Sequence, residues 1–478
     1  MRRRTRIVAT LGPATDPPGV LPELLRAGVD VARVNFSHGT AEDHLRRTAA
    51  LRDAARALDR PVAVLADLPG PKLRTRLDAP RPLHPGEEVR FALGDSPTAG
   101  DIAVTEPAVL RDVRPGQRVL LDDGRLQLEA LRRESDALVA KVKVGGELLP
   151  NKGVNLPDTE LSMPALTPRD REALETAAAA GVDWLALSFV RGPEAAPQVR
   201  AEAERHGLRA PVLAKIERPE AVAHADAILA AFDGIMVARG DLGVEIELER
   251  VPGVQKRLIA LARGAGKPVV TATDMLDSMR HNPRPTRAEV SDVANAIYDG
   301  TDAVMLSGET AVGAYPVGAV ACMHRIALET ESHLRQFPGA MLALPEAEER
   351  SVDAVTRTAC ALARDAGADA ILTPTLSGRT ARLLARHRPW ARLVAPAPEE
   401  AVVRRMALVW GVWPVWMKQP LKPGDDRLEA AVRAAFEAGA VQPGMCVVLL
   451  AGHPVEGGER LPTIRVVRIG EDGRAHEP

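Results

Sequence analysis

Side chains that can do chemistry recur at one kind of place in this chain, directly after short apolar runs typical of β-strands. Lys215 and Glu217 close the run VLAKIE, and Arg239 and Asp241 follow the run GIMVA. Residues two apart in a strand share a face, so Lys215 and Glu217 can point into one pocket. Helix capping would explain any one of these residues, but not the same pattern after six strands. The other members are Arg33, Asn35 and Ser37, then Asp67, Thr273, Ser307 and Glu309.

Glu217 and Asp241 are the best candidates for metal ligands. Two carboxylates offer the hard oxygens that Mg²⁺ or Mn²⁺ prefers, and substrate oxygens can complete the shell. Salt bridges to the abundant arginines are the structural alternative. Lys215 lies beside Glu217, where its ammonium can stabilise negative charge that develops on an oxygen. The turn ARGDLGVE around Gly240 offers free backbone N–H groups, which suit an anion such as a carboxylate.

The elements that must position these residues are strands and helices in alternation. Between most of the apolar runs lie amphipathic stretches such as TPRDREALETAAAAGVD. Strict alternation indicates βαβ units and a parallel sheet, and eight strands are the number that a closed (β/α)₈ TIM barrel needs. In such a barrel the carboxyl ends of the strands meet at one mouth. The expected strands are residues 6–12, 31–36, 62–68, 184–190, 212–217, 234–239, 268–273 and 302–309.

The alternation is interrupted once. Residues 71–160 are rich in Gly, Pro and short alternating runs such as EEVRFAL, which predicts a small all-β, barrel-like lid domain inserted in a loop at the catalytic mouth. The catalytic barrel then comprises residues 1–70 and 161–340. A restarted pattern in residues 341–478 predicts an open C-terminal α/β domain that can bind an effector.

Composition narrows the class of protein. The 478 residues carry a formal net charge of −2, which argues against general binding to nucleic acid or to a membrane surface. The basic N-terminus is followed by no long apolar stretch, so neither a signal peptide nor a membrane span is expected. Three widely spaced cysteines form no CxxC pair, which favours a reducing cytoplasm.

Several segments, in order and at family spacing, resemble the pyruvate kinases. They cover residues 4–330 densely and the C-terminal region more loosely. The most specific are MVARGDLGVE and MLSGETA; the others are RIVATLGPAT, ARVNFSHG, DLPGPKLRT, NKGVNLP, AKIE, KPVVTATDMLDSM and PTRAEVSDVANAIYDGTDAV. The resemblance implies phosphoryl transfer between phosphoenolpyruvate and ADP, giving pyruvate and ATP in the final step of glycolysis.

The resemblance also implies roles for individual residues. Arg33 and the backbone around Gly240 would hold the phosphate and carboxylate of the substrate, and Glu217 and Asp241 would bind Mg²⁺ or Mn²⁺. Lys215 would stabilise the enolate of pyruvate, and Thr273 would lie over its methylene face. Ser307 and Glu309 would belong to a proton relay nearby. Asn35, Ser37, His38, Arg74 and Lys152 would approach the nucleotide phosphates, and Asp123 either faces the nucleotide or makes a turn.

The chain departs from the family pattern at three places. Arg218 stands where AKIEN is common, Asp274 stands where ATQML is usual, and Lys72 stands where many members carry Glu. Those members bind K⁺ with the residues that correspond to Asn35, Ser37 and Asp67. An ammonium from Lys72 would supply this charge and repel a free cation, so the hypothesis is that K⁺ is not required. The chain has only nine Lys against fifty-three Arg, which favours a specific role for Lys72 over that of a solvated hinge residue.

Two further expectations concern regulation and assembly. TPTLSGRTA places Thr375, Ser377, Arg379 and Thr380 on a turn into a helix, which resembles the family's effector loop for a sugar phosphate or AMP. An ordinary helix N-cap at Ser377 is the alternative. The segment 285–296 matches a subunit contact of the family, which implies a homotetramer.

Two other functions compete with phosphoryl transfer. Metal-dependent carbon–carbon lyases acting on pyruvate or oxaloacetate also pair Glu and Asp on Mg²⁺ in a barrel, but they need no inserted lid. A catalytically dead relative would have lost Lys215, Glu217, Asp241 or Thr273, and all four are present. The sequence therefore favours a pyruvate kinase.

Overall fold

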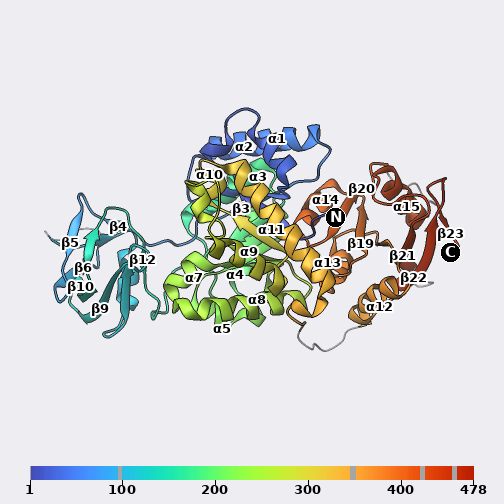
Figure 1. The fold of residues 1–478 in the computed structure, drawn as a ribbon. Helices are drawn as coiled ribbons and strands as arrows, with labels where there is room; N and C mark the ends of the chain where they lie inside the picture. Colours follow the sequence, from blue (N-terminus) through green and yellow to red (C-terminus); the bar gives the residue numbers. More distant parts are fainter. Residues whose placement is uncertain (1, 95–99, 345–350, 420–425, 455–459, 478) are drawn as a thin grey trace.

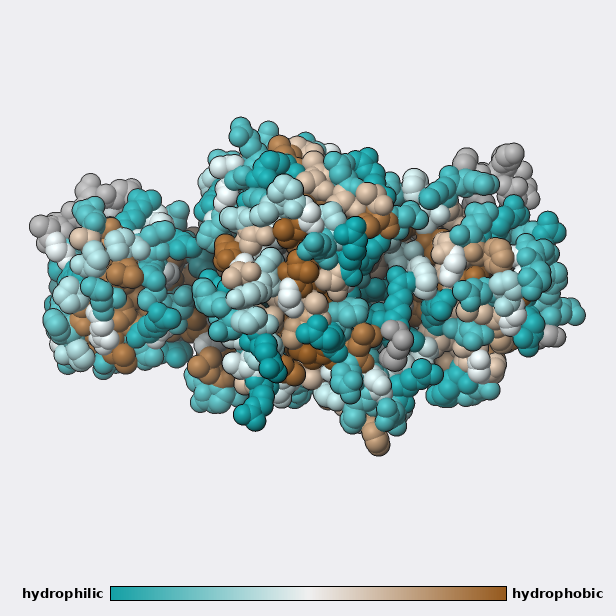
Figure 2. Space-filling view, turned by 45° about the horizontal axis from the view of Figure 1, so that its top comes forward, coloured by the Kyte–Doolittle hydropathy of each residue, from teal (hydrophilic) through white to brown (hydrophobic). Residues whose placement is uncertain are grey.

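The computed structural model describes residues 2–94, 100–344, 351–419, 426–454 and 460–477. It has three parts in a row (Figure 1): an all-β insert, a central barrel surrounded by helices, and a C-terminal α/β part. The surface in Figure 2 is mostly hydrophilic, with apolar residues scattered among polar ones. No helix among the described residues combines the length and the apolar character that crossing a membrane requires.

The central part is a closed parallel barrel, as the alternating pattern predicted. The strand order around it is β1-β17-β16-β15-β14-β13-β3-β2, so each expected strand is present. The strands are buried on both faces, which explains why they read as continuous apolar runs. Their bounds are β1 Arg6–Thr10, β2 Val31–Asn35, β3 Ala63–Asp67, β13 Trp184–Leu187, β14 Val212–Ile216, β15 Gly234–Ala238, β16 Val269–Ala272 and β17 Ala303–Leu306.

Helices cover the outside of the barrel. Three of them begin with a reciprocal capping box, in which Thr40, Thr167 and Thr286 each accept from the backbone of the acidic residue three positions on. The bounds are α1 Val20–Ala27, α2 Ala41–Ala57, α3 Pro168–Ala180, α4 Ala195–Arg205, α5 Pro219–Ala223, α6 Ala225–Ala231, α7 Arg239–Glu245, α8 Val251–Gly264, α9 Arg287–Asp299, α10 Gly308–Ala311 and α11 Pro316–Gln336.

The insert follows β3 and has its own apolar core around Phe91, Ile102 and Leu128. Its sheets are open in this structure, with a five-stranded sheet in the order β12-β8-β9-β10-β6 and the pairs β11-β5 and β4-β7. The strands are β4 Thr75–Arg76, β5 Arg81–Leu83, β6 Glu88–Ala92, β7 Ala103–Val104, β8 Arg118–Leu121, β9 Leu126–Arg133, β10 Ala137–Val144, β11 Gly146–Leu148 and β12 Val154–Asn155.

The C-terminal part is a six-stranded sheet in the order β20-β19-β18-β21-β22-β23, with apolar clusters on both faces. Its strands are β18 Ala370–Leu372, β19 Arg392–Ala397, β20 Val412–Trp416, β21 Cys446–Pro454, β22 Arg460–Ile469 and β23 Ala475–His476, and its helices are α12 Ser351–Asp365, α13 Arg379–Ala385, α14 Glu400–Arg405 and α15 Arg427–Glu437. Cys322, Cys360 and Cys446 are free thiols.

The C-terminal part seals one end of the barrel. Ala407 and Leu408 join the apolar cluster inside it, next to Val31 and Trp184 at the first residues of their strands. Arg404 reaches back to Asp183, with 2.8 Å between Nε and Oδ1. The amino ends of the strands are therefore closed, and the carboxyl ends are left for the site.

Candidate functional site

The carboxyl ends of the barrel strands bring charged side chains into one hydrogen-bonded cluster. Its centre is the ammonium of Lys215 near the end of β14, whose Nζ lies 3.0 Å from Glu217 Oε1 and 3.2 Å from Asp67 Oδ1. Lys215 Nζ also donates to Ser188 Oγ over 2.8 Å. Burial by itself would lower the pKa of Lys215, but Asp67 and Glu217 raise it above its usual value. Lys215 is therefore a charged ammonium at the barrel mouth.

The cluster continues through Asp67 to the neighbouring strands. Arg33 Nε donates to Asp67 Oδ2 over 2.7 Å, and Arg33 Nη1 donates to Thr10 Oγ1 over 3.1 Å. Burial would raise the pKa of Asp67, but Lys215 and Arg33 hold it below its usual value. The contacts cross five consecutive strands of the barrel, β14, β13, β3, β2 and β1. The order of the strands in the barrel thus brings residues that are far apart in sequence into one site.

Glu217 is fully buried, and its two carboxylate oxygens have different partners. Its Oε2 accepts from Phe189 N over 2.7 Å, whereas Oε1 takes part in no hydrogen bond within the described part of the chain. Burial raises the pKa of Glu217, and repulsion from Asp241 adds to the rise. Oε1, which lies 3.0 Å from the Lys215 ammonium, is a hard oxygen beside a second carboxylate, and this donor chemistry fits a divalent cation.

Asp241 lies in the first turn of α7, where a negative charge interacts favourably with the helix dipole. Its Oδ1 lies 3.2 Å from Lys72 Nζ. Across the described ranges, no three His, Cys, Asp or Glu side chains gather closely enough to hold a metal by themselves. Glu217 and Asp241 supply carboxylate oxygens, the donor chemistry that Mg²⁺ prefers.

Thr273 is held in a conformation that costs energy. Its φ is +68° and that of Asp274 is +54°, in the left-handed region that residues other than glycine seldom adopt. The Thr273 hydroxyl accepts from Gly240 N over 2.7 Å, while Arg239 Nη2 donates to the Thr273 carbonyl over 2.7 Å. These contacts join the ends of β15 and β16. Burial, and then Asp277, raise the pKa of Asp274.

Glu309 uses both carboxylate oxygens on backbone groups. Oε2 accepts from Ser307 N over 2.7 Å and Oε1 from Leu276 N over 3.1 Å. The Ser307 hydroxyl is buried and has no hydrogen-bond partner in the described residues. The structure thus brings Ser307 and Glu309 together, with Glu309 positioning the backbone.

The predicted nucleotide residues are divided between barrel and insert. Asn35 Oδ1 accepts from Ser37 N over 3.1 Å. Burial lowers the pKa of His38, and the positive charge of Arg74 lowers it further. Lys152 pairs instead with Asp122 inside the insert, with 2.7 Å between Nζ and Oδ1. Asp123 has a positive φ and belongs to the turn between β8 and β9.

The predicted monovalent-cation group forms only in part. Lys72 lies against Asp241, and no contact in the described residues joins its ammonium to Asn35, Ser37 or Asp67. Asp67 is already paired with Arg33 and Lys215. The reason is that the linker after β3 turns toward α7, a path that spacing in the sequence does not reveal.

Ser188 and Thr10 belong to the cluster, and sequence reasoning missed them. Both directly follow or end a barrel strand, in the runs WLALS and RIVAT. The rule that found Lys215 and Asp67 would have found them if it had been applied to the first and fourth strands.

The effector loop lies in the C-terminal part, before α13. Thr375 Oγ1 accepts from Gly378 N over 2.8 Å. Gly378 is the N-cap of α13, so the alternative of a cap at Ser377 is wrong. Ser377 and Arg379 are exposed. A cavity of about 500 Å³ borders the loop at Leu376 and Ser377.

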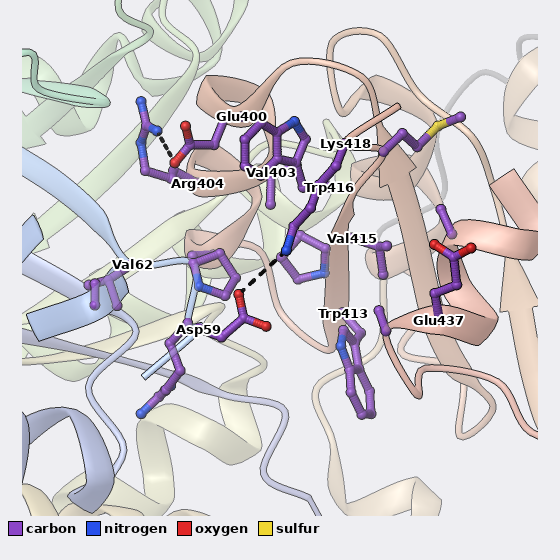
Figure 3. A pocket seen from close by; sticks show the side chains of 18 of the residues that line it. Asp59, Val62, Glu400, Val403, Arg404, Trp413, Val415, Trp416, Lys418 and Glu437 are labelled. Carbon is purple, nitrogen blue, oxygen red and sulfur yellow. Dashed lines mark ion pairs between the residues drawn. The ribbon is translucent and has the colours of Figure 1, made fainter. Parts of the chain in front are cut away.

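A cavity of about 680 Å³ lies between the barrel and the C-terminal sheet (Figure 3). Val62 and Asp59 line its barrel side, and Trp413 and Trp416 line the side of β20. Lys418 Nζ spans it to Asp59 Oδ1 at 3.9 Å. This cavity is at the amino ends of the strands, so it is separate from the cluster around Lys215.

Comparison with known proteins finds one protein family, the family that the sequence motifs resemble, over nearly the whole chain. Residues 2–320 match the family description "Pyruvate kinase, barrel domain", and residues 353–467 match "Pyruvate kinase, alpha/beta domain". The chain is 45% identical over 461 residues to a pyruvate kinase of Geobacillus stearothermophilus, covering 95% of this chain and 78% of the relative.

Two further relatives have matching lengths. A pyruvate kinase of Methylorubrum extorquens is 44% identical over 457 residues, which is 95% of this chain and 94% of the relative. A pyruvate kinase of Agrobacterium vitis is 42% identical over 483 residues, which is 98% of this chain and 99% of the relative. The similarity thus includes the barrel, the insert and the C-terminal part.

Proposed function

Because the chain belongs to the pyruvate kinase family and transfers a phosphoryl group between phosphoenolpyruvate and ADP, we propose that the cluster around Lys215 carries out this reaction. The observation that carries the proposal is the contact of the Lys215 ammonium with Asp67, Glu217 and Ser188 at the barrel mouth. Nothing in the comparisons favours the carbon–carbon lyase.

Glu217 and Asp241 would hold Mg²⁺ or Mn²⁺, which neutralises charge on the substrate oxygens when bound. Arg33 is oriented by Asp67 and Thr10, so its guanidinium is a fixed donor for the phosphate. The backbone at Gly240, in the first turn of α7, suits the substrate carboxylate.

Lys215 would neutralise the enolate oxygen that develops as the bond from oxygen to phosphorus breaks. A preorganised ammonium of this kind contributes most when water is excluded. Thr273 would lie over the methylene carbon that takes up a proton to give pyruvate. Ser307, whose hydroxyl has no other described partner, and Glu309 would form the relay that supplies this proton.

The nucleotide phosphates would bind between the barrel and the insert. Asn35 ends β2, and Ser37 and His38 follow it, while Arg74 lies on the linker into the insert. Lys152 would leave Asp122 for a phosphate when the insert closes as a lid. The catalytic domain would then comprise residues 1–70 and 161–340, the lid residues 71–160 and the effector domain residues 341–478. The three free thiols favour the reducing cytoplasm as the compartment.

The monovalent requirement would be met from within the chain. Lys72 places an ammonium 3.2 Å from Asp241, beside the proposed metal site. A second free cation at that distance would be repelled. The enzyme is therefore proposed to work with Mg²⁺ alone.

Replacing Lys215 by Met should lower turnover by about a hundredfold or more, because charge stabilisation of the enolate is lost. Pyruvate formation from phosphoenolpyruvate and ADP measures this. Binding of Mn²⁺, followed by electron paramagnetic resonance, should persist, since no ligand is removed. Glu217→Gln should lose both turnover and Mn²⁺ binding, whereas Asp43→Asn, at a partly exposed position in the first turn of α2, should keep both. A Lys215→Met enzyme that keeps more than a tenth of wild-type turnover would contradict the assigned role.

Potassium should activate the wild type less than about twofold in tetramethylammonium buffer free of K⁺ and NH₄⁺, because Lys72 already provides the charge. Lys72→Glu should create a K⁺ requirement of at least about tenfold. Lys418→Glu, on the opposite side of the barrel, is the matched control and should create none. Strong activation of the wild type by K⁺ would refute substitution by Lys72.

An activator should act through Thr375, Ser377, Arg379 and Thr380. The loop carries hydroxyl groups and a guanidinium at a turn, which are donors suited to binding a phosphate. Adding sugar phosphates and AMP in turn should shift the phosphoenolpyruvate saturation curve for one of them, and Arg379→Ala should remove the shift. A curve that responds to none of them would reject the effector role.

The assembly is proposed to be a homotetramer through α9. Val290 on its second turn is 37% exposed, an apolar residue at a surface that the family resemblance assigns to a subunit contact. Light scattering at micromolar concentration should give about four times the 51.1 kDa of one chain. A mass near that of a single chain would show that this surface stays free.

A further inference from the structure

Arg218 directly follows the proposed metal ligand Glu217, and resembling chains commonly have Asn there. Its side chain is 3% exposed. Nη2 lies 3.0 Å from Glu220 Oε1, and Nη1 lies 3.4 Å from Glu245 Oε2. Nη2 also donates to the Thr159 carbonyl over 3.0 Å and lies 3.3 Å from the Leu156 carbonyl oxygen. Arg218 therefore contacts the linker by which the chain returns from the insert to the barrel.

Glu245 extends the same contact to α7. It is the last residue of the helix that begins with Arg239 and includes Asp241, and its side chain is 1% exposed. Glu245 Oε1 accepts from Asn155 Nδ2 in β12 over 2.7 Å. We call Arg218, Glu245 and Asn155 the hinge clasp. It joins both proposed metal-ligand segments to the insert.

The clasp holds the incoming linker as well, because the two linkers pair with each other. Thr75 N donates to the Lys152 carbonyl over 2.8 Å, and Val154 N donates to the Leu73 carbonyl over 3.0 Å. The predicted nucleotide residues Arg74 and Lys152 belong to this paired ribbon. Lys152 precedes Asn155 by three residues. A fixed Asn155 therefore restricts where Arg74 and Lys152 can be.

General stability does not explain the clasp. Burying an ion pair costs desolvation free energy that the attraction rarely exceeds, and apolar residues often replace such pairs without loss. A buried, directional guanidinium with two carboxylates and two carbonyls does, however, define one geometry. The geometry defined here relates the insert to the segments of Glu217 and Asp241.

We propose that Arg218 is a positioning residue, which couples the lid to the metal-binding segments so that the nucleotide groups of the lid stay in register with the phosphoryl group. The inference rests on the proposed roles of Glu217, Asp241, Arg74 and Lys152. Arg218 touches no reacting atom. Its effect is to preorganise the nucleotide side of the site, which lowers the free-energy cost of binding ADP.

The test severs the clasp while leaving no unpaired buried charge. Arg218→Met alone strands Glu245, so Arg218→Met/Glu245→Met is the principal variant, and Arg218→Lys retains the charge without the forked geometry. Arg132→Met is the matched control, since Arg132 also pairs with two carboxylates, Glu88 at 2.9 Å and Glu134 at 3.1 Å, but on the exposed surface of the insert.

The first readout is amide hydrogen exchange across residues 151–160 in the enzyme without substrates. The double variant should exchange there about tenfold faster than the wild type, because the linker opens more often. Arg218→Lys should be intermediate, and Arg132→Met should match the wild type. Unchanged hydrogen exchange in the double variant would show that the hinge clasp does not hold the linker. This result would not depend on the roles proposed for the catalytic residues.

The second readout compares the KM for ADP with the KM for phosphoenolpyruvate. The KM for ADP should rise about tenfold in the double variant, while the KM for phosphoenolpyruvate changes less than about twofold. Equal rises in both would overturn the positioning role. Lys152→Met independently tests the lid's contact with ADP. If Lys152→Met leaves the KM for ADP unchanged, the proposed nucleotide site is wrong, even if the hydrogen-exchange result supports the hinge clasp.

Discussion

A buried ammonium and a buried guanidinium must offset two buried carboxylates at the mouth of the barrel, and the rest of the site depends on this constraint. Lys215, Asp67 and Glu217 are each costly to bury alone, and together they form a compact cluster. The cluster requires strands β14 and β3 to lie either side of β13, which contributes Ser188. A closed parallel barrel is the architecture that places these strand ends side by side.

The same cluster orients the groups around it. Asp67 accepts from Arg33, so the guanidinium is held on the side of β2 toward Thr10. Phe189, which donates its backbone N–H to Glu217, has a φ of +54°. Strained backbone also occurs at Thr273 and Asp274, on the far side of the mouth. Such conformations persist where the surrounding barrel overdetermines them, as in many active sites.

The two additions to the barrel lie at its opposite ends and serve different needs. The C-terminal part packs Ala407 and Leu408 into the amino end, which removes water from the inner core. The insert is joined at the carboxyl end through two paired linkers and the hinge clasp. Arg218 and Glu245 are the charged pair that joins the proposed metal-ligand segments to this hinge. These contacts tie the orientation of the insert at its hinge to the segments of Glu217 and Asp241.

The sequence by itself determined the strands, their order in the chain and most of the chemistry at their ends. Short, mostly apolar runs such as those of β14 and β15 are local patterns, and they place Lys215, Glu217 and Asp241 without tertiary information. Only the tertiary structure decided which charged side chains pair with which distant groups. Lys72 meets Asp241 across 169 residues, and Arg218 Nη2 meets the Thr159 carbonyl across 59. Such partners are chosen by the path of the linkers and the closure of the barrel, because a side chain's local sequence specifies its chemistry but not the distant backbone that folding brings against it.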